Sequence, residues 1–138
     1  MKTPVIADSS ALVAQASTVD HDHQLAVRLS IHIKTTNRAL IIPGEIFTET
    51  LNVLGKKVNH ELSVETGLKF LESKELTIME ATLQIRKKTL EKFQRQPKSV
   101  SFTDCLVMAF ADEFETKDIF GFDETFTKNG YERLGIDK

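Results

Sequence analysis

The sequence predicts an α/β protein built on a central parallel β-sheet. Short apolar runs of strand length alternate with longer runs in which apolar residues recur every three or four positions, as on one helix face. Strands separated by helices favour a parallel sheet that is covered on both faces. The chain has 138 residues, 41% hydrophobic and 28% charged, so we expect a single domain over 1–138 with a sizeable core.

The expected strands are apolar runs with turn-forming residues beside them. The first, Val5–Ala7, follows Pro4, and Pro43 with Gly44 stops the second. In chain order the expected strands are 5–7, 39–42, 76–79 and 119–122, and 133–136 is a candidate fifth. The sheet therefore has four to five strands.

The expected helices are placed by apolar periodicity and by capping residues at their ends. Gly55 is a candidate helix end, and the helix over 82–95 is expected to turn Leu83, Leu90 and Phe93 inward. In chain order, the helices are expected from Asp20 or Asp22 to about Lys34, over 44–54, from Ser63 to Ser73, over 82–95, and from Ser101 to about Phe114.

Four carboxylates occupy unusual places in this pattern. Asp8 and Asp123 end predicted strands, Asp104 opens a very apolar helix, and Glu49 lies between apolar positions of another helix. A lone carboxylate out of water is costly or takes up a proton. Because ligands of parallel sheets bind beyond the carboxyl ends of the strands, we expect the four acids to share a hard cation there.

Each acid also has a simpler interpretation by itself. Asp104 follows Ser101 at the spacing of a capping box, Asp8 could cap a helix, and Asp123 could be a turn residue. Glu49 could be a surface acid. The run His21-Asp22-His23 is a weaker metal candidate, because residues two apart do not share a helix face.

Two divalent ions roughly 4 Å apart can activate a water and relieve charge at both the phosphoryl and the leaving oxygen of a phosphodiester. Carboxylates suit Mg²⁺ or Mn²⁺, whereas a zinc site would favour His and Cys. The acids therefore fit a site for Mg²⁺ or Mn²⁺, and such a site is compatible with phosphodiester hydrolysis.

Read together, four segments resemble the PIN domain, a family of metal-dependent ribonucleases that includes VapC-type toxins. The resemblance covers nearly the whole chain. Its segments are Val5-Ile6-Ala7-Asp8-Ser9-Ser10-Ala11-Leu12, Pro43 with Glu49-Thr50-Leu51-Asn52-Val53-Leu54, Ser101-Phe102-Thr103-Asp104-Cys105-Leu106, and Phe122-Asp123-Glu124-Thr125-Phe126 ahead of Gly130. One departure is Gly121, where the family often has a hydroxyl residue.

The resemblance implies a PIN-like three-layer α/β/α fold and an endoribonuclease that uses Mg²⁺ or Mn²⁺ to leave a 5′-phosphate and a 3′-hydroxyl. It also implies the toxin of a type II toxin–antitoxin pair, with an antitoxin protein and a homodimer as candidate partners. The implied catalytic and metal-binding residues are Asp8, Glu49, Asp104 and Asp123, supported by Ser9, Ser10 and Asn52.

The net charge of −2 and the pI of about 6.1 exclude a general polyanion binder, so RNA affinity would need a local basic surface. Residues 81–98 hold six basic residues against Glu91, leaving 12 of the 18 basic and 19 of the 20 acidic residues elsewhere. Lys88, Lys92 and Arg95 can share one helix face, which makes them candidates for RNA binding. A solvated face is equally expected.

Two other function classes remain open. A receiver-like phospho-acceptor domain also places acids at strand ends, although Asp8-Ser9-Ser10 lacks its acidic pair. A catalytically inactive PIN-fold interaction module is the other. The single cysteine, Cys105, excludes an internal disulfide, and no run has the length of a membrane span or the pattern of a signal peptide. We therefore expect a cytoplasmic protein without a membrane partner.

Overall fold

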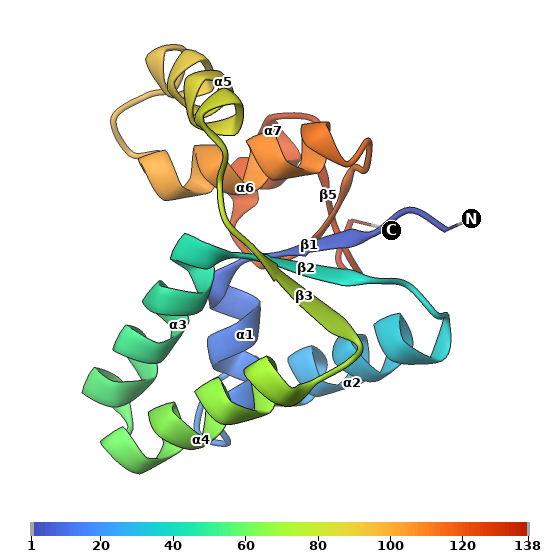
Figure 1. The fold of residues 1–138 in the computed structure, drawn as a ribbon, viewed down its shortest axis with the longest axis vertical. Helices are drawn as coiled ribbons and strands as arrows, with labels where there is room; N and C mark the ends of the chain where they lie inside the picture. The colour runs from blue at the N-terminus through green and yellow to red at the C-terminus, as the bar shows by residue number, and fades with distance from the viewer. Residues whose placement is uncertain (1, 138) are drawn as a thin grey trace.

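The computed structural model of the chain describes residues 2–137 and has a five-stranded parallel sheet at its centre (Figure 1). The strands are β1 (Val5–Ala7), β2 (Leu40–Pro43), β3 (Leu76–Met79), β4 (Asp118–Phe120) and β5 (Glu132–Arg133). Their order is β3-β2-β1-β4-β5, and every neighbouring pair is parallel. The predicted α/β class and the predicted strands are confirmed, with shifts of a few residues at the ends.

The strand order also decides against the receiver-like alternative. Receiver-type sheets of the flavodoxin-like class have the order 2-1-3-4-5, with the first strand next to the third. Here β1 lies between β2 and β4, and β3 is at the edge. The receiver-like alternative is therefore wrong.

Helices cover both faces of the sheet and give the three layers that were predicted (Figure 1). In that view α1 to α4 lie below the sheet and α5 to α7 lie above it. The helices are α1 (Ser9–Ala16), α2 (His23–Thr35), α3 (Gly44–Lys57), α4 (His60–Glu72), α5 (Leu83–Gln94), α6 (Phe102–Glu113) and α7 (Glu124–Lys128). None of the helices within residues 2–137 has the length and apolar character needed to cross a bilayer.

The core is centred on β1 and α6. All three residues of β1 are fully buried, and α6 is buried without interruption from Cys105 to Ala111. A helix that is apolar all round must be covered on several sides, and α6 lies between the sheet and α5. This packing fixes the start of α6, which carries Asp104.

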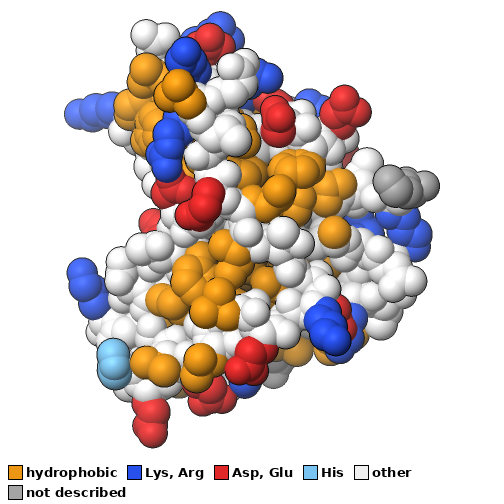
Figure 2. Space-filling model, viewed as in Figure 1, with side chains coloured by type: hydrophobic (Ala, Val, Ile, Leu, Met, Phe, Trp, Pro, Cys, Tyr) orange, Lys and Arg blue, Asp and Glu red, His pale blue; other side chains and the backbone are white. Residues whose placement is uncertain are grey.

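The prediction that Leu83, Leu90 and Phe93 of α5 face the core is wrong. Leu83, Leu90 and Phe93 are 69%, 52% and 40% exposed, and exposed apolar side chains gather over α5 at the upper left of Figure 2. The buried residues of α5 are Ile85 and Thr89 instead. Thr89 is tolerated there because its hydroxyl donates to the Ile85 carbonyl at 2.7 Å, which satisfies a buried polar group locally.

Two helix boundaries also differ from the expectation. Gly55 does not end α3, which continues to Lys57, and Ser63 does not cap α4. The cap of α4 is Asn59, whose side-chain oxygen accepts from the Leu62 N–H at 2.7 Å. The Ser63 hydroxyl donates to the Leu51 carbonyl at 2.7 Å, so it joins α4 to α3.

Two helices were not predicted, and each begins directly after a candidate site acid. Asp8 caps α1 and Asp123 caps α7. Since α1 is short and has no exposed residue, it lacks the clear polar and apolar stripes that mark an amphipathic helix.

Candidate active site

The four predicted acids line one cavity of about 360 Å³ at the carboxyl edge of the sheet. Asp8 follows β1 and Asp123 lies three residues after the end of β4, and these two strands are parallel neighbours. Glu49 projects from α3, and Asp104 lies in the first turn of α6. The structure therefore brings the four acids to one place, while their roles as ligands and catalysts stay predictions.

Asp8 is the buried member of the set, with only 5% of its surface exposed. The Ser10 hydroxyl donates to Asp8 Oδ2 at 2.8 Å and accepts from the Phe122 N–H at 3.0 Å. One hydroxyl thus joins the segment after β1 to the segment after β4. This bridge holds the Asp8 carboxylate in one orientation.

Gly121 lets the segment after β4 approach Asp8 closely. A Cβ built on Gly121 would lie 2.8 Å from the Asp8 Cβ, which is closer than two carbons can pack. Gly121 is the position at which this chain departs from the hydroxyl residue that the PIN family often has. In this chain the hydroxyl that supports Asp8 comes from Ser10 instead.

Burial raises the pKa of the Asp8 carboxyl from 3.8 to about 6. The Ser10 hydrogen bond lowers the pKa, and the neighbouring Asp104 carboxylate raises it. At neutral pH the group is therefore mostly ionised in a place that penalises its charge. A bound cation would relieve both the desolvation and the repulsion from Asp104.

Asp104 and Asp123 each cap a helix as well as line the cavity. Asp104 Oδ2 accepts from the Ser101 N–H at 3.1 Å and the Ser101 hydroxyl accepts from the Asp104 N–H at 3.0 Å, a complete capping box. Asp123 Oδ1 accepts from the Thr125 N–H at 2.9 Å. Each cap uses one carboxylate oxygen and leaves the other for a ligand. The capping-box interpretation of Asp104 is confirmed, whereas Asp123 caps α7 and does not lie in a turn.

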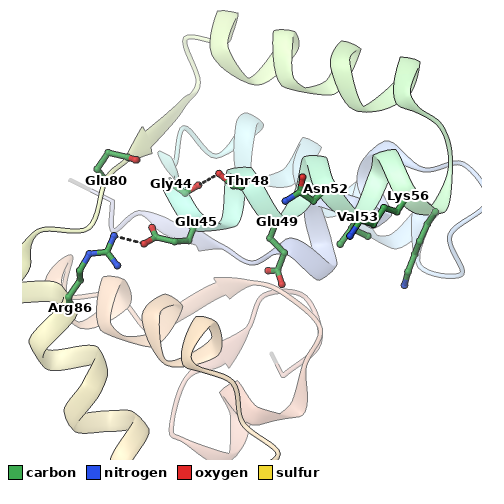
Figure 3. Close-up of a pocket in the computed structure, with 10 residues that line it drawn as sticks. Gly44, Glu45, Thr48, Glu49, Asn52, Val53, Lys56, Glu80 and Arg86 are labelled. Atoms are coloured by element: carbon green, nitrogen blue, oxygen red, sulfur yellow. Dashed lines mark hydrogen bonds and ion pairs between the residues drawn. The ribbon is translucent and has the colours of Figure 1, made fainter.

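Glu49 is half-buried and points from α3 toward the α6 side (Figure 3). Asn52 does not line the acid cavity; it lines a neighbouring cavity along α3. The acid cavity also contains Asp20, Asp22 and Lys57, which were not predicted as site residues. For Asp20 and Asp22, the only signal in the sequence was helix capping. For Lys57, the last residue of α3, nothing in the sequence indicated that it lines the same cavity as Asp8.

The donor atoms suit Mg²⁺ or Mn²⁺, although the acids do not form a closed ligand set. Within residues 2–137 no three His, Cys, Asp or Glu side chains are arranged to hold a metal ion. Mg²⁺ usually keeps several waters and is bound through one or two carboxylates. The pair of Asp8 and Asp104 fits that mode, with Glu49 and Asp123 lining the same cavity.

The histidines beside Asp22 have other contacts. His23 Nδ1 lies 2.8 Å from the Ala14 carbonyl oxygen, and His21 Nδ1 lies 3.3 Å from Asp22 Oδ1. Neither His21 nor His23 lines the acid cavity. The structure therefore gives no support to a metal site at His21-Asp22-His23.

Lys88 and Lys92 lie on the side of α5 that contacts α6, and Arg95, which directly follows α5, lines a cavity with Lys92. Lys88 and Arg95 are nevertheless exposed. Lys92 Nζ lies 2.6 Å from Asp112 Oδ2 and 3.1 Å from the Tyr131 hydroxyl, and Lys88 Nζ lies 3.9 Å from Glu113 Oε2. These contacts tie α5 to α6 and to Tyr131, which directly precedes β5. RNA binding by the three residues stays a prediction, and Lys92 has a structural role that competes with it.

The raised pKa of Asp8 predicts how Asp8→Asn changes stability with pH. The pKa of Asp8 is higher in the folded state than in the unfolded state. The protonated Asp8 carboxyl therefore contributes fully to stability below pH 3.8, and this contribution is lost as the pH rises through about 6. Asn removes the charge and keeps an acceptor for Ser10. In a metal chelator, Asp8→Asn should therefore stabilise the protein above pH 6, on the order of 3 kcal/mol. The gain should vanish near pH 4. Denaturant unfolding at both pH values measures it, and an equal effect at both would contradict the burial argument.

Ser10 and Ser9 provide a matched pair for the support of Asp8. Ser10→Ala removes the hydroxyl bridge, whereas Ser9 lines the cavity without a side-chain hydrogen bond to Asp8 in the described structure. Loss of a group that orients a metal ligand typically lowers metal affinity by about 10- to 100-fold. The Mn²⁺ concentration that half-saturates the rise in melting temperature should increase by that factor in Ser10→Ala and stay unchanged in Ser9→Ala. Equal responses in both variants would remove Ser10 from the site.

Neither the known protein-family profiles nor the curated proteins include a match to this chain. A solved structure does: the VapC20 toxin of Mycobacterium tuberculosis, described as cleaving the sarcin–ricin loop, superimposes with a TM-score of 0.83. The match covers 94% of this chain and 98% of that toxin, at 18% sequence identity. An identity this low establishes the fold and not the activity. The chain has the fold of a VapC-type PIN domain, as the sequence resemblance predicted.

Proposed function

We propose that this protein is a divalent-metal-dependent endoribonuclease. The observation that carries the proposal is the buried Asp8 carboxylate, which has a raised pKa beside Asp104 in an open cavity. A structural carboxylate would be expected to have a cationic partner or to be exposed. Asp8 is buried and has no cationic partner within residues 2–137, so a bound cation is the best account of its position.

The proposed cations are Mg²⁺ or Mn²⁺, held by Asp8 and Asp104 with help from Glu49 and Asp123. When bound, such ions supply an activated water and offset the charge that builds on the phosphoryl and leaving oxygens. Ser10 orients Asp8, and the two capping interactions hold Asp104 and Asp123 at the cavity. Together these contacts preorganise the acids before the substrate arrives.

The structural similarity to a toxin also supports a proposal about the biological role of this protein. VapC20 is described as a toxin that cleaves the sarcin–ricin loop. We infer that this chain is the toxin of a toxin–antitoxin pair, acts on RNA in the cytoplasm and is neutralised by an antitoxin protein. A homodimer is a further candidate assembly. An RNA that contains the sarcin–ricin loop is a suitable first substrate.

Removing the charge of single site acids should abolish RNA cleavage while the protein stays folded. Asp104→Asn keeps an acceptor for the capping box, and Glu49→Gln changes a residue with no ion pair among those described. Each should lower the Mn²⁺-dependent cleavage rate by more than the ~100-fold typical of losing a supporting group.

Glu72→Gln is the control for this experiment, because Glu72 is exposed on α4 outside the cavity and has no ion pair in the described structure. Its rate should match the unsubstituted protein. If purified Asp104→Asn cleaves RNA at the unsubstituted rate, the metal-nuclease proposal is wrong. If the unsubstituted protein is inactive with Mg²⁺ and Mn²⁺ on a broad RNA panel, the inactive interaction module becomes the better account.

A further inference from the structure

A second cavity of about 460 Å³ runs along the outer face of α3, next to the acid cavity. The two cavities share Glu49, Val53 and Lys57, so they form one continuous groove. Figure 3 shows this face of α3, with Glu49 pointing toward the α6 side and Asn52 further along the helix. A substrate chain that occupies the acid cavity can therefore continue into the second cavity without leaving the surface.

The groove follows from the sequence of α3. Glu45, Glu49, Asn52 and Lys56 are separated by four, three and four residues, which places them on one stripe of the helix. The stripe begins with an acid, has an amide near its centre and ends with lysines. Its polarity therefore changes along its length.

The amino end of the groove carries a net negative charge, from Glu45 and Glu80 against Arg86. Arg86 Nη2 lies 2.6 Å from Glu45 Oε2, an ion pair that joins α5 to α3. The Glu80 carboxylate occupies the space that a side chain on Gly44 would fill. A carboxylate is favoured there by the N-terminal end of α3, and the same carboxylate would repel a phosphate.

The other end of the groove is basic. Lys56 and Lys57 are exposed, and no described carboxylate lies within ion-pair distance of either ammonium group. Lys57 is also the only cationic side chain among the described residues that line the acid cavity. Eight of the other 15 described lysines and arginines form ion pairs, so Lys56 and Lys57 are distinguished by their place and not by being unpaired. Both line the cavity along α3, and Lys57 also lines the acid cavity, where its charge complements an anion.

We propose that the cavity along α3 binds the nucleotide next to the bond that is cut in single-stranded RNA. Lys57 contacts the phosphate of that nucleotide, and Asn52 hydrogen-bonds the edge of its base. This proposal rests on the proposed ribonuclease activity and adds the path and the contacts of the substrate. It assigns Lys57 and Asn52 as positioning residues.

The chemistry of the groove fits this ligand in three respects. Its volume lies in the range of about 300–1,000 Å³ that small-molecule sites occupy. Single-stranded RNA can turn an unstacked base outward and present its hydrogen-bonding edge. The Asn52 amide offers both a donor and an acceptor to such an edge. The acidic end excludes the phosphate, so the base points toward Gly44 and the phosphate toward Lys57.

The test measures binding of a fluorescent, mixed-sequence, single-stranded RNA oligonucleotide at several salt concentrations. The full chain carries Asp104→Asn so that bound RNA is not cut. Lys57→Gln and Asn52→Ala are compared with Lys74→Gln, an equal charge change at an exposed lysine just before β3. Lys74 lies at the opposite, amino edge of the sheet.

The three variants should change RNA affinity and its salt dependence in different ways. Lys57→Gln should reduce the slope of log affinity against log salt by about 0.7, the value for one phosphate contact on a single strand. Asn52→Ala should leave the slope unchanged, weaken binding by roughly tenfold and reduce differences among oligonucleotides of different base. Lys74→Gln should match the parent. In the cleavage-competent protein, Lys57→Gln should raise KM more than it lowers kcat.

The outcomes separate this inference from the proposed function. If the parent binds and cleaves RNA but Lys57→Gln and Asn52→Ala behave like Lys74→Gln, the groove is not part of the RNA path and the ribonuclease proposal stands. A protein that neither binds nor cleaves RNA would overturn both. A changed salt slope in Lys57→Gln alone would support the phosphate contact and overturn the role of Asn52.

Discussion

The structure depends on a carboxylate that is buried at the end of the central strand and has no ion-pair partner among the described residues. Asp8 is almost completely enclosed, its pKa is raised to about 6, and the carboxylate of Asp104 adds repulsion. Asp8 caps α1, but a cap needs only an acceptor oxygen, and the unpaired buried charge itself disfavours the folded state. Ser10 and Gly121 nevertheless hold Asp8 in place, one by bridging the two strand ends and the other by leaving room for them. The local structure thus holds the Asp8 charge in an unfavourable environment. A bound divalent cation would offset the unfavourable free energy of that charge.

The other site acids stabilise the fold and also reach the cavity. Asp104 completes a capping box and Asp123 caps α7, so both would be retained in a protein with no catalytic role. Because β1 and β4 are parallel neighbours, the helices that follow them, α1 and α7, begin at the same edge of the sheet and bring their caps Asp8 and Asp123 there. Asp104 reaches this edge from the start of α6, which follows α5, and Glu49 reaches it from within α3. Removing a single acid tests the site only when the replacement keeps the cap.

The sequence predicted the sheet and the four acids because both depend on patterns along the chain. Apolar runs placed the strands. Asp8, Asp104 and Asp123 were placed at the edge of the sheet by their positions at element boundaries, and Glu49 was placed by its position between apolar residues of a helix. The inward face of α5 was predicted wrongly, because Leu83 and Leu90 suggested a buried stripe and the packing on α6 uses Ile85 and Thr89. Lys57 could not be predicted as a residue of the acid cavity, because its place there depends on how far α3 continues beyond Gly55.

The central claim is that a divalent cation occupies the cavity between Asp8 and Asp104. Anomalous diffraction from a crystal soaked in Mn²⁺ tests it most directly, because the signal locates the ion without reference to any activity. The account predicts a peak within coordination distance of both carboxylates, and loss of that peak in a crystal of the Asp8→Asn variant. A crystal that shows Mn²⁺ elsewhere, or none at this pair at saturating concentration, would contradict it.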